Sequence, residues 1–109
     1  MIATKKHALE IAQEVKKGLE TIYGPRLKGV YLYGSAARDE LNENSDIDIA
    51  VILDKINNRY LEHKRISQLG ADVSLQNDTV VLFLFATQEE LETGRIAIFR
   101  NIRREGILA

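Results

Sequence analysis

The chain has 109 residues, of which 45% are hydrophobic and 28% are charged, and its formal net charge is -1. This length predicts a single domain over residues 1–109, and this balance excludes a disordered or membrane-spanning chain. The near-zero net charge disfavours binding to long nucleic acids, because no overall positive field attracts them.

The first part of the chain predicts one helix and two strands with a short helix between them. Apolar residues recur at three- and four-residue steps over residues 4–22, which is typical of an amphipathic helix, and the breaker at 23–25 ends it. Residues 29–33 predict the first strand, and residues 36–43 suit a short helix. Residues 46–53 predict a second strand whose continuous apolar half indicates an interior position in a sheet.

The middle of the chain predicts a further helix and a third strand. Residues 57–76 have a helical spacing of apolar side chains, which Gly70 weakens. Residues 79–86 contain no polar side chain after Thr79. We therefore expect this third strand to be buried on both faces.

The last part of the chain predicts two helices. Thr87 and Glu90 have the spacing of a capping box, which marks the start of a helix. Residues 96–105 predict a final helix up to Gly106. The order of elements predicts an α/β (α+β) fold in which helices cover a small mixed sheet.

Two acidic residues stand at the start of the second predicted strand. Strand side chains alternate, so Asp46 and Asp48 emerge on one face while Ile47 and Ile49 point to the other. Two carboxylates ~7 Å apart along a strand repel each other unless a cation lies near both. Oxygen ligands suit Mg²⁺ or Mn²⁺, so we interpret the pair as a metal site, with solvated surface charge as the alternative.

A Gly-Ser pair follows the first predicted strand. Glycine lets a backbone approach a ligand closely, and amides at the start of a helix attract anions. The Ser35 hydroxyl can donate to a phosphate oxygen, and Arg38 can add a charge-assisted contact. Gly34, Ser35 and Arg38 are therefore candidate phosphate ligands, although each alone is also typical of a turn or of an exposed surface.

The stretch "YGSAARDELNENSDIDIAVIL" resembles the signature of the nucleotidyltransferase domain of the DNA polymerase β superfamily, which is an apolar residue, Gly-Ser, a spacer and Asp-x-Asp with apolar neighbours. Gly34, Ser35, Asp46 and Asp48 match this signature, and Arg38 matches the arginine usual after Gly-Ser in small bacterial and archaeal members. The chain length and "FRNIRREGIL" are similar to the minimal nucleotidyltransferases. The resemblance implies their polymerase β-like fold.

The resemblance also implies a function. Asp46 and Asp48 would be catalytic residues that hold Mg²⁺ or Mn²⁺, while Gly34, Ser35 and Arg38 would bind the triphosphate of an NTP, with ATP as the expected one. The reaction would move a nucleotide monophosphate to a protein or small acceptor. A small, all-helical HEPN-type protein is the implied partner, with this chain as the antitoxin of a toxin–antitoxin module. Self-association is left open.

The sequence departs from the family at one position. Catalytic members usually have a third carboxylate on the next core strand, whereas the alignment places an apolar residue there, near Leu82. Asp78 lies four residues earlier, and Asp72 belongs to the preceding predicted helix. Three alternatives follow: an active transferase, a catalytically weak or inactive nucleotide-binding interaction partner, and a purely structural domain, which would leave the acid pair unexplained.

Composition and apolar stretches also predict where in the cell the protein is located. The chain contains no cysteine, so disulfides and thiolate-bound zinc are excluded. Its longest apolar stretches, 49–53 and 80–86, are far shorter than the ~20 residues that a membrane helix needs, and its first residues do not follow the pattern of a secretion signal. We therefore expect a cytoplasmic protein without membrane contact.

Overall fold

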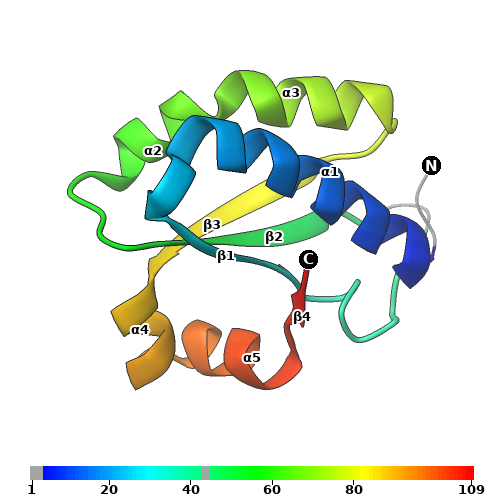
Figure 1. Ribbon diagram of the computed structural model, residues 1–109. Coiled ribbons are helices and arrows are strands. Elements are labelled where there is room, and N and C mark those ends of the chain that lie inside the picture. Colours follow the sequence, from blue (N-terminus) through cyan, green and yellow to red (C-terminus); the bar gives the residue numbers. More distant parts are fainter. Residues whose placement is uncertain (1–3, 43–44) are drawn as a thin grey trace.

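The computed structural model describes residues 4–42 and 45–109, which form a four-stranded sheet with helices on both faces (Figure 1). The elements in chain order are α1 (Lys5–Tyr23), the 3₁₀ turn η1 (Gly24–Arg26), β1 (Leu27–Tyr33), β2 (Ile47–Leu53), α2 (Arg59–Arg65), α3 (Ser67–Gln76), β3 (Val81–Thr87), α4 (Gln88–Thr93), α5 (Ala97–Glu105) and β4 (Ile107–Leu108). The strand order is β3-β2-β1-β4, in which only β2 and β3 are parallel. The predicted α/β fold with a small mixed sheet is confirmed.

Helix α1 forms because its ends are capped and its apolar residues share one face. The Thr4 side chain accepts a hydrogen bond from the His7 backbone N–H at 3.2 Å, and Gly24 ends the helix with a positive φ of 55°. One face of α1 is buried against the sheet, through Ala8, Ile11, Ala12, Val15 and Leu19. None of the helices in the described ranges is both long and apolar enough to cross a membrane.

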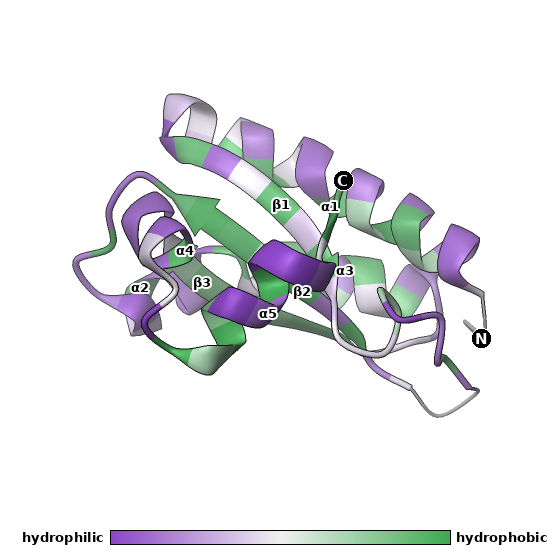
Figure 2. Ribbon diagram, turned by 90° about the horizontal axis from the view of Figure 1, so that it is seen from below, coloured by the Kyte–Doolittle hydropathy of each residue, from purple (hydrophilic) through white to green (hydrophobic). Residues whose placement is uncertain are grey.

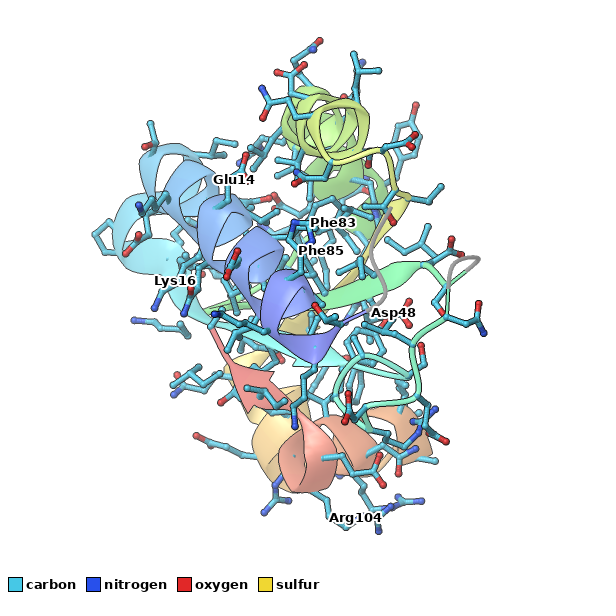
Figure 3. The ribbon with its side chains drawn as sticks, turned by 90° about the vertical axis from the view of Figure 1, so that its right-hand side faces the viewer. Glu14, Lys16, Asp48, Phe83, Phe85 and Arg104 are labelled. Atoms are coloured by element: carbon cyan, nitrogen blue, oxygen red, sulfur yellow. The ribbon has the colours of Figure 1, made fainter. Side chains whose placement is uncertain are left out.

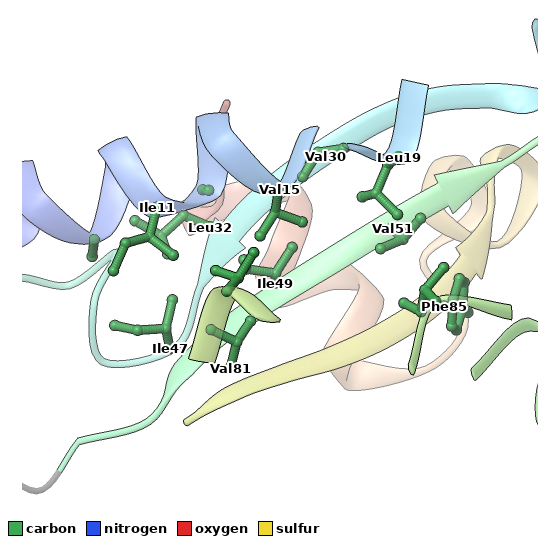
Figure 4. Packing of buried hydrophobic residues seen from close by; sticks show 14 of the residues in the cluster. Ile11, Val15, Leu19, Val30, Leu32, Ile47, Ile49, Val51, Val81 and Phe85 are labelled. Atoms are coloured by element: carbon green, nitrogen blue, oxygen red, sulfur yellow. The ribbon is translucent and has the colours of Figure 1, made fainter. Parts of the chain in front are cut away.

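Alternate residues of β2 enter two separate apolar clusters. Ile47, Ile49 and Val51 pack with α1 on one face, in a cluster that also includes Val73 of α3 (Figure 4). On the other face, Ala50 and Ile52 pack with residues of α4 and α5, including Leu91, Phe99 and Ile102. Figure 2 shows this second side, with hydrophilic residues on the outside of α5 and hydrophobic strands behind it. The interior position predicted for the second strand is confirmed.

The short helix predicted for residues 36–43 was wrong for the residues that the structure describes. After β1 the chain makes one turn, in which the Arg38 N–H donates to the Gly34 C=O at 3.3 Å. Asp39 then adopts a left-handed φ of 58°, and the Glu40 N–H donates back to the Ser35 C=O at 2.8 Å. This conformation closes a loop instead of extending a helix. Residues 43 and 44 lie outside the described residues.

The helix predicted for residues 57–76 is two helices, and its break is not at Gly70. The chain bends at Ile66, where the Ser67 hydroxyl donates to the Lys64 C=O at 2.9 Å and so competes with regular helical hydrogen bonding. Gly70 lies inside α3, where an added Cβ would be 2.9 Å from the Phe83 ring. The glycine therefore allows α3 to lie close to β3.

Strand β3 lies at an edge of the sheet, so the expectation of burial on both faces was wrong. Val81 and Phe85 are buried, whereas Leu82 is 46% exposed. The capping box at Thr87 and Glu90 is confirmed. Strand β4 was not predicted, because two residues are too few to show a periodic pattern.

Candidate functional site

The two acidic residues lie where the strand pattern predicts. Asp46 is exposed just before β2, and Asp48 is half-buried. Asp48 is the second residue of β2 (Figure 3). Ile47 and Ile49 point to the opposite face and are fully buried. Asp48 therefore lies on the face of β2 that α4 and α5 cover further along the strand, and the Asp46 carboxylate is close enough to act on its charge.

The turn after β1 lies directly against Asp48. Tyr33, the last residue of β1, is opposite Asp48 in the antiparallel register, so the next residue, Gly34, begins its turn beside the carboxylate. Gly34 has a φ of 69°, and a Cβ added to it would collide with the Asp48 side chain. Glycine is thus required both by the backbone conformation and by this close approach. The structure brings together these two residues, which are 14 positions apart in the sequence.

Ser35 and Arg38 belong to the same turn. Ser35 is partly exposed, and Arg38 is exposed and forms ion pairs with Glu40 and, at 3.6 Å, with Glu105 of α5. The hydrogen bond from Arg38 to Glu40 raises the pKa of the guanidinium above its usual value. A helix dipole cannot contribute here because the turn is not followed by a helix in the described residues. The Ser35 hydroxyl and the Arg38 charge remain as candidate phosphate ligands.

Asp46 and Asp48 place two carboxylates close together where the second of them is half-buried. Burial, and secondly the neighbouring Asp46 carboxylate, raise the pKa of Asp48, while the positive charge of Arg38 opposes this shift. Burial and the charge of Asp48 raise the pKa of Tyr33 to about 12. A half-buried carboxylate whose ionisation a neighbouring carboxylate disfavours fits a divalent cation with oxygen ligands.

Among the residues that the structure describes, no third carboxylate joins the pair. Leu82 of β3 is the residue beside Asp48 in the parallel register, as the alignment predicted. Asp78 lies in the turn before β3, and Asp72 of α3 accepts a hydrogen bond from Gln68 at 2.8 Å. Within residues 4–42 and 45–109, no group of three or more His, Asp or Glu residues could hold a metal ion. A cation held by Asp46 and Asp48 could take further ligands from phosphate or water.

A cavity of about 610 Å³ next to Asp48 was not predicted from the sequence. It extends from Tyr33 and Asp48, past Leu82, to the space between β3 and α3. The helix contributes only small side chains to its wall, namely Ser67, Gly70, Ala71 and Ser74. Their helical spacing was a usable signal, although it is equally typical of close helix packing.

One family model matches most of the chain. The model of the nucleotidyltransferase domain matches residues 12–104 of the chain, which include the turn after β1, both acidic residues and Leu82. A Methanocaldococcus jannaschii protein provisionally named protein adenylyltransferase MJ0141 is 32% identical over 73 residues, which cover 67% of this chain and 73% of the relative.

Solved structures share the fold at low sequence identity. A provisionally named nucleotidyltransferase from Sulfolobus solfataricus has a TM-score of 0.68 and 22% identity, covering 95% of this chain and 80% of that one. A complex of a tri-AMPylated Shewanella oneidensis HEPN toxin with its MNT antitoxin has a TM-score of 0.58 and 19% identity, covering 93% of this chain and 70% of the matched one.

Proposed function

Because this chain belongs to the nucleotidyltransferase domain family, we propose that it is a minimal, single-domain transferase that moves AMP from ATP to a hydroxyl group of a protein. The observation that carries the proposal is the contact of the Gly34 turn with Asp48, which places a candidate phosphate site against a pair of carboxylates. The 32% identical relative named as a protein adenylyltransferase supports both AMP and a protein acceptor.

The proposal gives each site residue a role. Asp46 and Asp48 would hold Mg²⁺ or Mn²⁺, which supplies positive charge to the phosphates when it is bound. The missing side chain of Gly34 leaves room for the triphosphate beside Asp48. The Ser35 hydroxyl donates to a phosphate oxygen, and Arg38 exchanges its ion pair with Glu40 for a phosphate.

In the reaction, the acceptor oxygen forms a bond to the α-phosphorus of ATP while the bond from that phosphorus to the α,β-bridging oxygen breaks. Pyrophosphate leaves with the bonding electron pair, and the acceptor proton passes to solvent. Leu82 stands beside Asp48 where an additional acid would help to remove this proton. We therefore expect the isolated chain to transfer AMP slowly.

The proposed partner is a small helical protein of the HEPN type, with this chain as antitoxin. The fold shared with the MNT antitoxin of a HEPN toxin complex supports this pairing. Leu82 favours one second candidate function, a nucleotide-binding partner with weak or no catalysis. The cytoplasmic location stays a prediction from the sequence.

Incubation with ATP labelled on the α-phosphate tests the proposal. We expect Mg²⁺-dependent label on a copurifying helical protein, and none when Asp46→Asn or Asp48→Asn replaces the natural chain. Nucleotide that binds to the natural chain without any transfer would favour the second candidate. Rapid transfer to unrelated proteins would contradict the need for a dedicated partner.

Binding of ligand fragments tests the phosphate site separately. Ser35→Ala should weaken the binding of ATP more than the binding of adenosine, because the hydroxyl is proposed to contact a phosphate. Equal weakening of the two ligands would show that Ser35 does not face the triphosphate.

A further inference from the structure

The free edge of β3 has hydrogen-bonding groups that point away from the sheet. The Ile47 N–H of β2 donates to the Val80 C=O at 2.9 Å, which fixes the phase of the parallel ladder. Residues 80, 82 and 84 therefore direct their backbone groups towards β2, and Val81, Phe83 and Phe85 direct theirs outwards.

One outward group is satisfied at each end of β3, and the groups between them are not. The Val81 N–H donates to the Ser74 hydroxyl at 3.2 Å, and the Phe85 C=O accepts from Arg59 at 3.4 Å. Between these two bonds, the Val81 C=O, the N–H and C=O of Phe83 and the Phe85 N–H have no protein partner among the described residues. This is a short gap where another strand could pair.

The gap opens into the cavity that contains Asp48. Gly70, Ala71 and Ser74 of α3 line the same cavity, so α3 contributes no large side chain to this part of its wall. A paired strand lies only ~4.8 Å from its neighbour and needs such a narrow, open space. A second cavity of about 420 Å³ shares Ala71 and Ser74, so the groove continues past the start of β3.

Exposed apolar side chains border this groove. Leu82 is 46% exposed, Val80 is 53% exposed and Leu75 of α3 is 84% exposed, and each lines one of the two cavities. Contiguous exposed apolar surface of this kind marks interaction sites. A partner that covers the groove would bury these side chains in addition to pairing with Phe83.

The direction of the proposed reaction also points to this side. The strand order places β2 between β1 and β3, so the Gly34 turn and Leu82 flank Asp48 from opposite sides. In phosphoryl transfer, the attacking and leaving oxygens lie roughly in line on opposite sides of the phosphorus. If the Gly34 turn holds the leaving pyrophosphate, the acceptor enters from the side of β3.

We propose that the acceptor is an extended segment of a partner protein, which pairs with β3 at Phe83 as an additional strand and directs a hydroxyl side chain towards Asp48. This inference rests on the proposed transferase function and adds the form in which the acceptor is recognised. Backbone pairing would supply affinity, and the apolar border would select the neighbouring side chains.

Peptide mixtures test the inference on the full chain. One mixture contains peptides of about nine residues, within the usual length of a strand, with a central Tyr, Ser or Thr and random flanking residues without Cys or Pro. A second mixture has the same composition but N-methylated flanking amides, which cannot pair as a strand. With labelled ATP and Mg²⁺, we expect label on the first mixture and at least about tenfold less on the second.

Hydrogen exchange gives a readout that does not need catalysis. Labelled peptides would be sequenced, resynthesised and added to the chain, and exchange at the Phe83 amide should slow by at least about tenfold. Equal labelling of the N-methylated mixture, or unchanged exchange at Phe83, would overturn the inference. Slow exchange that instead grows with protein concentration in the absence of peptide would identify a second copy as the occupant and also overturn it.

Two variants of α3 make the test specific to the groove. Ala71→Phe fills the wall shared by both cavities, whereas the control Gln76→Phe changes an exposed residue that lines neither. Peptide labelling should fall at least about tenfold in Ala71→Phe and stay unchanged in the control, with equal Mg²⁺–ATP affinity in both. Equal peptide labelling by the two variants would contradict the claim that the peptide binds in the groove between β3 and α3. A natural chain that does not bind Mg²⁺–ATP would overturn the transferase proposal itself. A natural chain that binds the nucleotide but labels neither peptide mixture would overturn only the proposed pairing with β3.

Discussion

The two faces of β2 differ in how completely they are covered. On the face below α1 and α3, Ile47, Ile49 and Val51 are all fully buried. On the other face, α4 and α5 cover Ala50 and Ile52 but leave Asp48 half-buried next to a cavity. Neighbouring residues of one strand thus serve different purposes, and changes on the two faces should affect stability and ligand binding separately.

The largest effect on stability is expected on the covered face. Ile49→Ala should lower the free energy of unfolding by about 2–5 kcal/mol, because it removes buried methyl groups and leaves a cavity. Urea denaturation followed by circular dichroism measures this change. Ile96→Ala, at a position that is 57% exposed, is the matched control and should change stability little. Similar losses of unfolding free energy in both variants would show that burial on the covered face of β2 does not determine stability.

An intermediate effect is expected at Gly34, which belongs to the open face. Gly34→Ala and the control Gly24→Ala both place a side chain at a positive φ, which costs on the order of 1–3 kcal/mol. Only at Gly34 would the new Cβ also collide with Asp48, since nothing lies within 4 Å of a Cβ at Gly24. Gly34→Ala should therefore lose Mg²⁺–ATP binding as well as stability.

Denaturation and calorimetry on the two glycine variants distinguish these effects. If Gly24→Ala weakened nucleotide binding as much as Gly34→Ala, general destabilisation would explain the loss, and the contact with Asp48 would be irrelevant.

The smallest effect is expected at high pH, on the covered face. The buried Tyr23 hydroxyl donates to Glu62 at 2.9 Å, and burial, followed by this hydrogen bond, raises the pKa of Tyr23 above its usual 10.0. The folded state then keeps a proton that the unfolded state loses, so this stabilisation is complete below pH 10 and decreases above it. By pH 11 the loss should be about 1 kcal/mol.

Comparison with Tyr23→Phe isolates this contribution from the other groups that titrate at high pH. The decrease in unfolding free energy above pH 10 should be smaller in the variant than in the natural chain. Identical pH profiles would show that Tyr23 is not held in its protonated form.

Much of the fold was predictable because its signals are local and repeated. The apolar face of α1, the interior position of β2 and the capping box of α4 each follow from side chains close together in sequence. The break at Ile66 was not predictable, since it depends on one hydroxyl that competes for a backbone carbonyl. The edge position of β3 depends on strand order, which its own composition does not encode.

The candidate site was predicted in part. Strand alternation placed Asp46 and Asp48 on one face, and the motif placed Gly34 nearby. The collision that requires glycine beside Asp48, and the cavity between β3 and α3, arise from contacts between distant segments. The helix expected after Gly34 was absent because Asp39 adopts a left-handed conformation, which sequence spacing alone does not reveal.

Calorimetric titration of Mg²⁺–ATP into the natural chain, Asp46→Asn and Asp48→Asn tests the central claim most directly. We predict measurable binding to the natural chain and loss of at least about tenfold in affinity in each variant, with the urea midpoint of unfolding not lowered. Unchanged affinity in both variants would contradict the assignment of Asp46 and Asp48 as the metal site.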